Sequence, residues 1–151
     1  MPIDFSGGAS ANLINRNLNV IGTDKTDKIN IVPTTNSIQV EINGKVQEFK
    51  KSDIDSISVK SLGGNDEVKV IENKKTGSSL KSISLNIDGG EGDNIIVGGS
   101  GSNNLVAGSG NNTIMGGLGK NIISVGNGDN KIIGTAQVTH GTGKNTIKKY
   151  Y

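Results

Sequence analysis

The stretch that decides the fold is GGEGDNIIVGGSGSNNLVAGSGNNTIMGGLGKNIISVGNGDNKII, residues 89–133. It divides into five units of nine residues, and a sixth unit, HGTGKNTIK, follows at residues 140–148. Positions two and four of every unit are glycine, position six is asparagine, and position eight is isoleucine or leucine. A fixed period of nine residues is typical of a solenoid, in which stacked units bury one continuous core.

Each unit reads as one tight turn followed by one short strand. The two glycines supply the positive φ angles that the turn requires, and positions seven to nine form a three-residue strand whose middle side chain points inward. Two units make one winding, and windings stack about 4.8 Å apart as parallel strands. Each buried position-eight side chain contributes about 1.5–3 kcal/mol before entropy is counted. The segment at residues 134–139 keeps the period if Val138 is another position eight after a shortened turn.

This pattern resembles the nonapeptide repeats of RTX (haemolysin-type calcium-binding) proteins, whose consensus is G-G-x-G-x-D-x-U-x. The resemblance covers residues 89–148, and weaker matches occur in GTDKTDKIN at 22–30 and LGGNDEVKV at 62–70. It implies a parallel β-roll. We therefore predict an all-β fold with a parallel β-roll or β-solenoid over residues ~80–148, preceded by a β-rich N-terminal portion with a hairpin.

The chain departs from the family at position six, where the resemblance implies an aspartate that binds calcium. Asparagine stands there in all six units: Asn94, Asn103, Asn112, Asn121, Asn130 and Asn145. Calcium affinity depends on the number of anionic oxygens, which neutral amides do not supply. The amide N–H groups are instead free to donate to turn carbonyls. We predict a structural ladder of stacked asparagines that replaces the metal.

Calcium remains an alternative, because an Asn carbonyl oxygen is also a weak ligand. Asp27 and Asp66 occupy the family's aspartate position in the two weaker matches and are the only weak metal candidates. No other cofactor is expected. The acids of the repeats, Glu91, Asp93 and Asp129, lie at positions three and five, where we expect them to point into solvent and protect the edge.

The N-terminal portion, residues 1–88, is β-rich but lacks the period of nine. In SIQVEINGKVQEF, at residues 37–49, apolar residues alternate about Asn43-Gly44, which favours a type I′ hairpin. Further strands are expected near residues 57–59, 68–70 and 83–87. Residues 1 to about 30 are expected to cap the roll, with LINRNLNVI as a short amphipathic strand or helix. We expect one continuous domain made of this portion and the RTX-like roll, residues 89–151.

Alternate units are expected on opposite faces of the roll. One face then carries outward side chains at positions seven and nine, among them the candidate interaction face Ile95, Val97, Thr113, Met115 and Ile133. An ordered apolar column is unusual on a soluble monomer. It predicts packing against another part of the chain, self-association, or a protein partner.

Other function classes have little support in the sequence. The formal net charge is only +2, and the chain has two Tyr, two Phe and no Trp, so nothing indicates nucleic-acid binding. No run of 18 apolar residues predicts a membrane span. The chain has no Cys and a single His, His140, expected in an exposed turn, and no nucleophile or phosphate-binding motif is present. We predict that the protein is not an enzyme and has no catalytic residues.

The leading interpretation is a non-enzymatic bacterial β-roll module, secreted or delivered, that serves protein interaction or structural support and folds without calcium. The resemblance implies export, typically by type I secretion, and the start MPIDFSGGASANLINRN does not resemble an N-terminal signal peptide. A Ser- and Asn-rich start also suits type III secretion. One alternative is a calcium-binding RTX module that folds on export, and another is a carbohydrate-binding accessory module.

Overall fold

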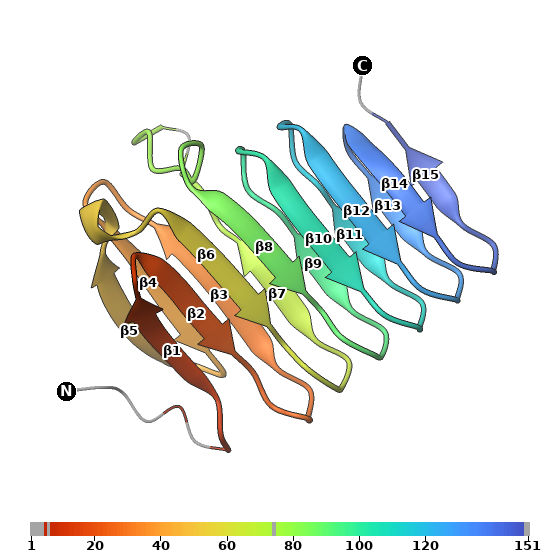
Figure 1. Ribbon diagram of the computed structural model, residues 1–151, viewed down its shortest axis with the longest axis horizontal. Helices are drawn as coiled ribbons and strands as arrows, with labels where there is room; N and C mark the ends of the chain where they lie inside the picture. Colours follow the sequence, from red (N-terminus) through yellow and green to blue (C-terminus); the bar gives the residue numbers. More distant parts are fainter. Residues whose placement is uncertain (1–4, 6, 74, 150–151) are drawn as a thin grey trace.

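The computed structural model describes residues 5, 7–73 and 75–149, and over these residues the chain forms two stacked sheets (Figure 1). The seven-stranded sheet runs, in spatial order, β1 Ser10–Ile14, β2 Asn17–Ile21, β6 Ser56–Lys60, β8 Ser84–Asp88, β10 Asn103–Ala107, β12 Asn121–Val125 and β14 Ala136–His140. The eight-stranded sheet runs β15 Thr146–Lys148, β13 Lys131–Ile133, β11 Thr113–Met115, β9 Ile95–Val97, β7 Glu67–Val70, β3 Lys28–Pro33, β4 Ser37–Ile42 and β5 Lys45–Lys50. A 3₁₀ turn, η1, spans Lys51–Asp53.

From β6 onwards the chain alternates between the two sheets, and each strand pairs in parallel with the strand one winding away. The predicted all-β parallel β-roll is therefore confirmed. Parallel winding also begins earlier than residue 80, because β2 pairs in parallel with β6 and β3 pairs in parallel with β7. The N-terminal portion and the repeats thus share both sheets.

The number of residues in a winding changes along the chain. Hydrogen-bonded position-six residues are separated by 18 residues within the repeats and by 15 at the last winding. The shorter spacing confirms the shortened turn, and Val138 pairs with Ile123 in register. The first two windings span 39 and 28 residues, because β4, β5 and η1, and then residues 71–83, are inserted between strands.

Aliphatic side chains from both sheets meet between them and form the core. In the eight-stranded sheet the central column is Ile29, Val68, Ile96, Ile114, Ile132 and Ile147. In the seven-stranded sheet it is Val20, Val59, Ile87, Leu105, Ile123 and Val138. Ile147, in the last described winding, is 39% exposed, whereas Ile96, Ile114 and Ile132 are 0% exposed.

The prediction that every strand of the repeats has three residues is wrong for one of the two sheets. They have three residues in the eight-stranded sheet but five in the seven-stranded sheet. The longer strands β10 and β12 end on Ala107 and Val125, which occupy position one of the next unit and are buried. After β9 and β11 the same position is glycine, Gly98 or Gly116, and the strand stops.

Two hairpins close the N-terminal end of the roll. Asn43 and Gly44 have φ angles of 52° and 88°, as the predicted two-residue turn between β4 and β5 requires. Asn15 and Arg16, at 49° and 64°, form a second turn of this kind between β1 and β2. The segment expected as one strand or helix is therefore two antiparallel strands. The sequence did not indicate this turn because Arg is uncommon at positive φ.

The two ends of the roll differ. At the N-terminal end, antiparallel strands β1 and β5 form the edges of the two sheets, and Phe5 is buried in the core. At the C-terminal end, every residue of β15 is exposed. The terminal Tyr150 and Tyr151 lie outside the described residues. Among the described residues, no helix has the length and apolar character needed to cross a bilayer.

Close stacking of the turns makes some glycines irreplaceable. Gly110 has a φ of 128°, and a Cβ there would overlap the carbonyl oxygen of Gly92 in the preceding winding. We expect Gly110→Ala to lower the free energy of unfolding by about 2–4 kcal/mol. Gly44, with a φ of 88° and open space around it, is the matched control, and Gly44→Ala should cost only about 1–2 kcal/mol. Urea unfolding followed by circular dichroism measures both, and equal losses would contradict the stacking argument.

Candidate functional site

The candidate site lies in the turns that join the two sheets. We call the connections from the seven-stranded to the eight-stranded sheet the lower turns and the return connections the upper turns, as they lie in Figure 1. Position six of the lower turns, the inner ladder, is occupied in order by Asp27, Asp66, Asn94, Asn112, Asn130 and Asn145. Position six of the upper turns is occupied by Asn103 and Asn121. All are buried except Asn145, which is half-buried in the last winding.

Each inner-ladder asparagine joins its own turn to the preceding one. The backbone N–H of Asn94 donates to Oδ1 of Asn112 at 3.0 Å, and the N–H of Asn112 donates to Oδ1 of Asn130 at 3.0 Å. The N–H of Asn130 donates to Asn145 Oδ1 at 3.3 Å. In each lower turn of the repeats, a side-chain carbonyl therefore accepts the backbone N–H that would pair with a backbone carbonyl inside the sheet.

The amide nitrogen of the same side chain closes its own turn. Asn112 Nδ2 lies 3.1 Å from the carbonyl oxygens of both Gly108 and Gly110, at positions two and four of its unit. Asn94 and Asn130 make the same pair of contacts at 3.1–3.3 Å. Because carbonyl oxygens only accept and the backbone N–H only donates, this environment fixes which end of each amide is oxygen and which is nitrogen.

The upper turns repeat the arrangement with more acceptors. Asn103 Nδ2 lies within 2.7–3.0 Å of the carbonyls of Gly99, Gly101 and Gly116 and of Oδ1 of Asn121. Asn121 Nδ2 lies 2.9–3.3 Å from three backbone carbonyls, the last of them in the shortened turn at Thr135. Oxygen atoms therefore surround each amide nitrogen as they would surround a cation.

These turns do not fit calcium as they stand. The family's calcium is held by carboxylate oxygens together with turn carbonyls, and a cation needs oxygen atoms directed at it. Here an amide nitrogen with two protons is directed at the turn carbonyls in every asparagine turn of the repeats. Its hydrogen bonds satisfy buried acceptors that would otherwise cost about 1–3 kcal/mol each.

The first two lower turns carry aspartate instead. Asp27 is satisfied on both oxygens, because Oδ2 accepts the Thr23 N–H at 2.6 Å and Oδ1 accepts Asn43 Nδ2 at 2.8 Å. Asp66 Oδ1 accepts the Asp27 N–H at 2.8 Å, which continues the inner ladder. Asp66 Oδ2 is buried and accepts no hydrogen bond from a described residue, and the nearby Ser61 hydroxyl donates to the Gly89 carbonyl at 3.1 Å.

Asp66 is therefore the electrostatic exception in the inner ladder. Its side chain stands where Asn94, one winding later, directs an amide nitrogen at two turn carbonyls. Burial, aided by the negative charge of Asp27, raises the pKa of Asp66, and hydrogen bonding to the Asp27 backbone and the Ser61 hydroxyl opposes this only in part. A proton or a cation on Oδ2 would supply the missing positive partner.

A second column of side chains follows the outside of the lower turns. At position five, Asn65 Oδ1 accepts the Asp93 N–H, Asp93 Oδ1 accepts the Asn111 N–H, and Asp129 Oδ1 accepts the Lys144 N–H, all at 2.7–2.8 Å. The expectation that the acids only point into solvent needs correction. Asp93 and Asp129 are exposed, but each bonds the next turn, and Glu91 Oε2 does so with the Ser109 N–H.

The candidate interaction face lies on the outside of the eight-stranded sheet. Ile95, Thr113 and Lys131 stand in register across β9, β11 and β13, and so do Val97, Met115 and Ile133. Ile95 is 41% exposed and Met115 is 38% exposed, while Val97, Thr113 and Ile133 are half-buried. Ile95 and Met115 therefore keep exposed apolar surface on this face.

No catalytic arrangement is found in the described part of the chain. His140 is the last residue of β14 rather than a turn residue, is exposed, and has Nδ1 2.9 Å from its neighbour's carbonyl at Gly141. Among the described residues, no three His, Asp or Glu side chains form a group that could hold a metal ion. The absence of enzymatic activity stays a prediction.

Comparison with known proteins places the repeats in a family. Residues 88–123, 97–132 and 115–137 match the family model described as RTX calcium-binding nonapeptide repeat (4 copies). These residues are therefore RTX-type repeats, in a β-roll whose metal position carries asparagine. Neither curated proteins nor solved structures gave a significant match to the chain.

The sequence indicated part of this site only. The asparagine at position six of every repeat predicted the inner ladder. The residues at position five of the lower turns, here called the outer column, mix Asn, Asp and Lys, and no ladder was predicted from them. The contacts that saturate Asp27 come from Thr23 and Asn43, and Asn43 belongs to a hairpin 16 residues away. Only the alternation of Asn65, Asp93, Asn111 and Asp129 could have signalled the outer column.

Removal of one inner amide should cost far more than removal of its neighbour. Asn112→Ala leaves two turn carbonyls and the Asn94 N–H unpaired in a buried site, so we expect a loss of about 3 kcal/mol in unfolding free energy. Asn111→Ala, one residue away but exposed, should cost about 0.5–1.5 kcal/mol. Denaturant unfolding of both variants tests this, and a harmless Asn112→Ala would contradict the ladder.

Asp66→Asn should stabilise the protein in a pH-dependent way. Because the pKa of Asp66 is raised in the folded state, its contribution to stability falls as pH rises from its ordinary value of 3.8 through the raised value. The amide has no charge to lose and gains two donors for the turn carbonyls. We expect the variant to gain about 1 kcal/mol at neutral pH and clearly less at pH below 3.8, where the protonated carboxyl group is also neutral and has a donor of its own. Thermal unfolding measured across this pH range would contradict the argument if the difference did not change.

Proposed function

We propose that this protein is a non-enzymatic β-roll module that holds its windings together without calcium. The observation that carries the proposal is the placement of each asparagine Nδ2 against the position-two and position-four carbonyls of its own turn, as at Asn112. The two amide protons occupy the electrostatic role that the family assigns to the cation. Folding then requires no rise in calcium concentration.

The setting proposed for the module is outside the cell that makes it. RTX repeat proteins are typically secreted, and the repeats at residues 88–137 are of this type. A fold that needs no ion would form before, during or after export, unlike a calcium-dependent relative. The bacterial source, the route of export and any role in virulence are part of the same proposal.

The proposed activity is protein interaction through the candidate interaction face. Support comes from the in-register column Val97, Met115 and Ile133, flanked by the exposed Ile95. Solvent-exposed apolar side chains in an ordered row favour burial against another surface. The first partner to test is a second copy of the chain, because two copies carry the same column.

Calcium binding at a single turn is a second candidate function. It is favoured by one observation, the buried and unpartnered Oδ2 of Asp66. The carbohydrate-binding alternative has less support, because Phe5 is buried and Phe49 partly buried, which leaves no aromatic platform for a sugar ring among the described residues.

A calcium titration separates the two modes of folding. We expect the wild-type circular dichroism spectrum and thermal midpoint to be unchanged between EGTA and millimolar calcium. In Asn94→Asp/Asn112→Asp/Asn130→Asp, three buried carboxylates replace the amide donors, so we expect unfolding in EGTA and recovery with calcium. Loss of wild-type β-signal in EGTA would refute the main proposal. A single calcium site in wild type that Asp66→Asn abolishes would establish the second candidate.

Self-association is tested by size-exclusion chromatography with light scattering. We expect wild type to show concentration-dependent dimers and Met115→Lys to be monomeric. Ile122→Lys is the matched control, because Ile122 is 56% exposed on the opposite face, in β12. A wild-type monomer at all concentrations, with Met115→Lys unchanged in stability, would contradict the proposed face.

A further inference from the structure

A hollow of the surface lies away from the inner ladder, at the upper N-terminal corner of the roll. It has a volume of about 550 Å³ and is open to solvent. Five segments that are distant in sequence line it: the β1–β2 turn, the β3–β4 turn, the end of β5 with η1, the residues before β6, and the residues before β8. We call it the corner groove.

The walls of the corner groove are tied to one another. The Lys51 N–H donates to the carbonyl of Asn36 at 2.9 Å, and the Asp55 N–H donates to the carbonyl of Arg16 at 2.8 Å. Ile54 and Ile83 are 4% and 5% exposed and anchor the floor in the core. The backbone hydrogen bonds and the buried isoleucines therefore fix the shape of the groove in the absence of a ligand.

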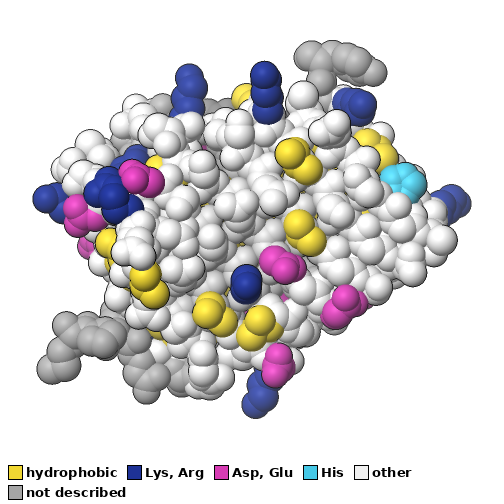
Figure 2. Space-filling view, in the orientation of Figure 1, with side chains coloured by type: hydrophobic (Ala, Val, Ile, Leu, Met, Phe, Trp, Pro, Cys, Tyr) yellow, Lys and Arg dark blue, Asp and Glu magenta, His cyan; other side chains and the backbone are white. Residues whose placement is uncertain are grey.

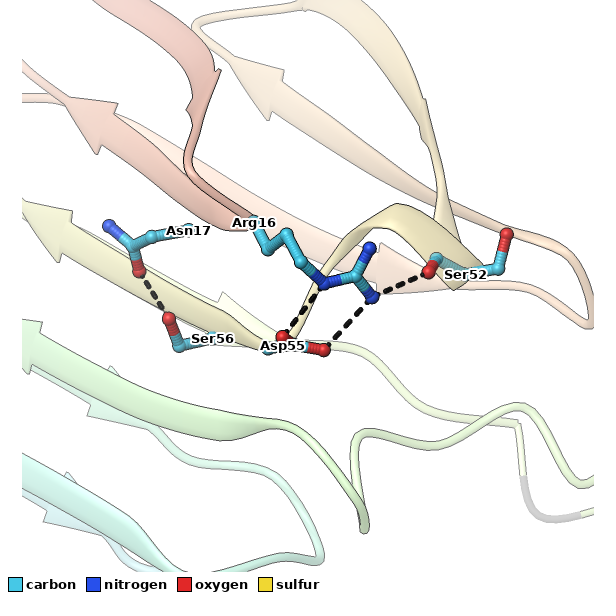
Figure 3. Close-up of polar contacts among 5 residues, drawn as sticks. All are labelled: Arg16, Asn17, Ser52, Asp55 and Ser56. Carbon is cyan, nitrogen blue, oxygen red and sulfur yellow. Dashed lines mark hydrogen bonds and ion pairs between the residues drawn. The ribbon is translucent and has the colours of Figure 1, made fainter.

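Positive charge predominates in this lining, with Arg16, Lys50 and Lys51 against the single carboxylate of Asp55. The Arg16 guanidinium forks onto Asp55 through Nε at 2.8 Å and Nη2 at 3.0 Å, and Nη2 also donates to the Ser52 carbonyl at 2.8 Å (Figure 3). The hydrogen bond from Arg16 lowers the pKa of Asp55, which keeps that carboxylate charged. Nη1 makes no hydrogen bond to another described residue.

The two lysines keep donors available. Lys51 Nζ makes one hydrogen bond, to the Thr34 carbonyl at 3.2 Å, and Lys50 is exposed. Neither forms an ion pair with a carboxylate of the described residues, where the ion pairs are Arg16–Asp55 and Lys69–Glu67. In Figure 2, basic side chains gather at this end of the molecule, with acidic side chains beside them, close to the corner where Figure 1 shows η1.

From this arrangement we propose that the corner groove binds an oxyanion, a phosphate, sulfate or carboxylate group. An oriented guanidinium and two ammonium groups form charge-assisted hydrogen bonds with such a group. The side chains of Thr35, Ser52 and Ser82 add neutral donors on the rim. Arg16, held by Asp55, positions the site, and Lys50 and Lys51 supply positive charge that forms no ion pair with a carboxylate of the described residues.

A second hollow, beside the first lower turns, has a lining of opposite charge, which supports the selectivity of the corner groove for anions. That hollow, about 410 Å³, is lined by Asp27, Glu67, Asp66 and Asp93 and by one lysine, Lys28. Its electrostatic sign is opposite to that of the corner groove. The two ends of the same windings thus favour ligands of opposite charge, and the proposal does not depend on the calcium question or on the interaction face.

The test is isothermal titration of the whole chain with inorganic phosphate, sulfate and acetate at constant low ionic strength. The variant is Lys50→Gln/Lys51→Gln, which leaves the Arg16–Asp55 pair in place. The matched control, Lys25→Gln/Lys144→Gln, removes the same charge from exposed positions in the lower turns. We expect the groove variant to weaken binding of at least one probe by tenfold or more, and the control to change it less than twofold.

Backbone amide shifts in the NMR spectrum locate the bound ion independently of affinity. Saturation with the tightest probe should shift the amides of Ser52 and Ser82 in wild type and in the control, but not in the groove variant. Equal loss of affinity in the groove variant and the control, shifts confined to the lower turns, or no binding of any probe would each overturn the proposal. Thermal midpoints of both variants close to wild type exclude unfolding as the cause.

Discussion

The roll depends on the hydrogen bonds of one amide group per turn. Each turn of the repeats directs two of its carbonyl oxygens, from positions two and four, at the same point, and the next backbone N–H lacks a ladder partner. An Asn side chain satisfies all of these groups at once, as Asn112 does with 3.0–3.1 Å contacts. A carboxylate at this place repels the carbonyls unless a proton or a cation intervenes or N–H donors are turned toward it, as at Asp27, whereas asparagine needs none of these.

The same reasoning accounts for the irregular N-terminal windings. In the seven-stranded sheet the column that carries Asn103 and Asn121 continues backwards as Leu85, Ile57 and Leu18, all buried. Once a hydrocarbon side chain fills this place, the upper turn no longer needs carbonyls that converge on an amide. Its length is then free, and β4, β5, η1 and residues 71–83 are inserted there without breaking the register of the strands.

These insertions give the molecule its chemical asymmetry. The repeats carry short turns and, on one outer face, an apolar column along β9, β11 and β13. The inserted segments line the corner groove, and they bring Lys50 and Lys51 next to Arg16. Lower turns, in contrast, carry Asp93 and Asp129 in a column that also bonds one winding to the next. The regular repeats and the inserted segments that line the corner groove therefore lie in different parts of the same roll.

The sequence by itself determined the parallel roll, the shortened turn before Val138, the hairpin at Asn43-Gly44 and the shared position of six asparagines. These features depend on contacts that recur at a fixed spacing or within four residues, so a periodic sequence expresses them directly. Only the tertiary structure decided the early start of the winding, the Asn15-Arg16 turn, the partners of Asp27 and Asp66, and the corner groove. The Asn15-Arg16 turn is local, but Arg is uncommon at positive φ and so gave no turn signal. The other features include contacts between segments 16 to 39 residues apart with no repeated spacing, and long-range pairing of that kind leaves no local pattern in a single sequence.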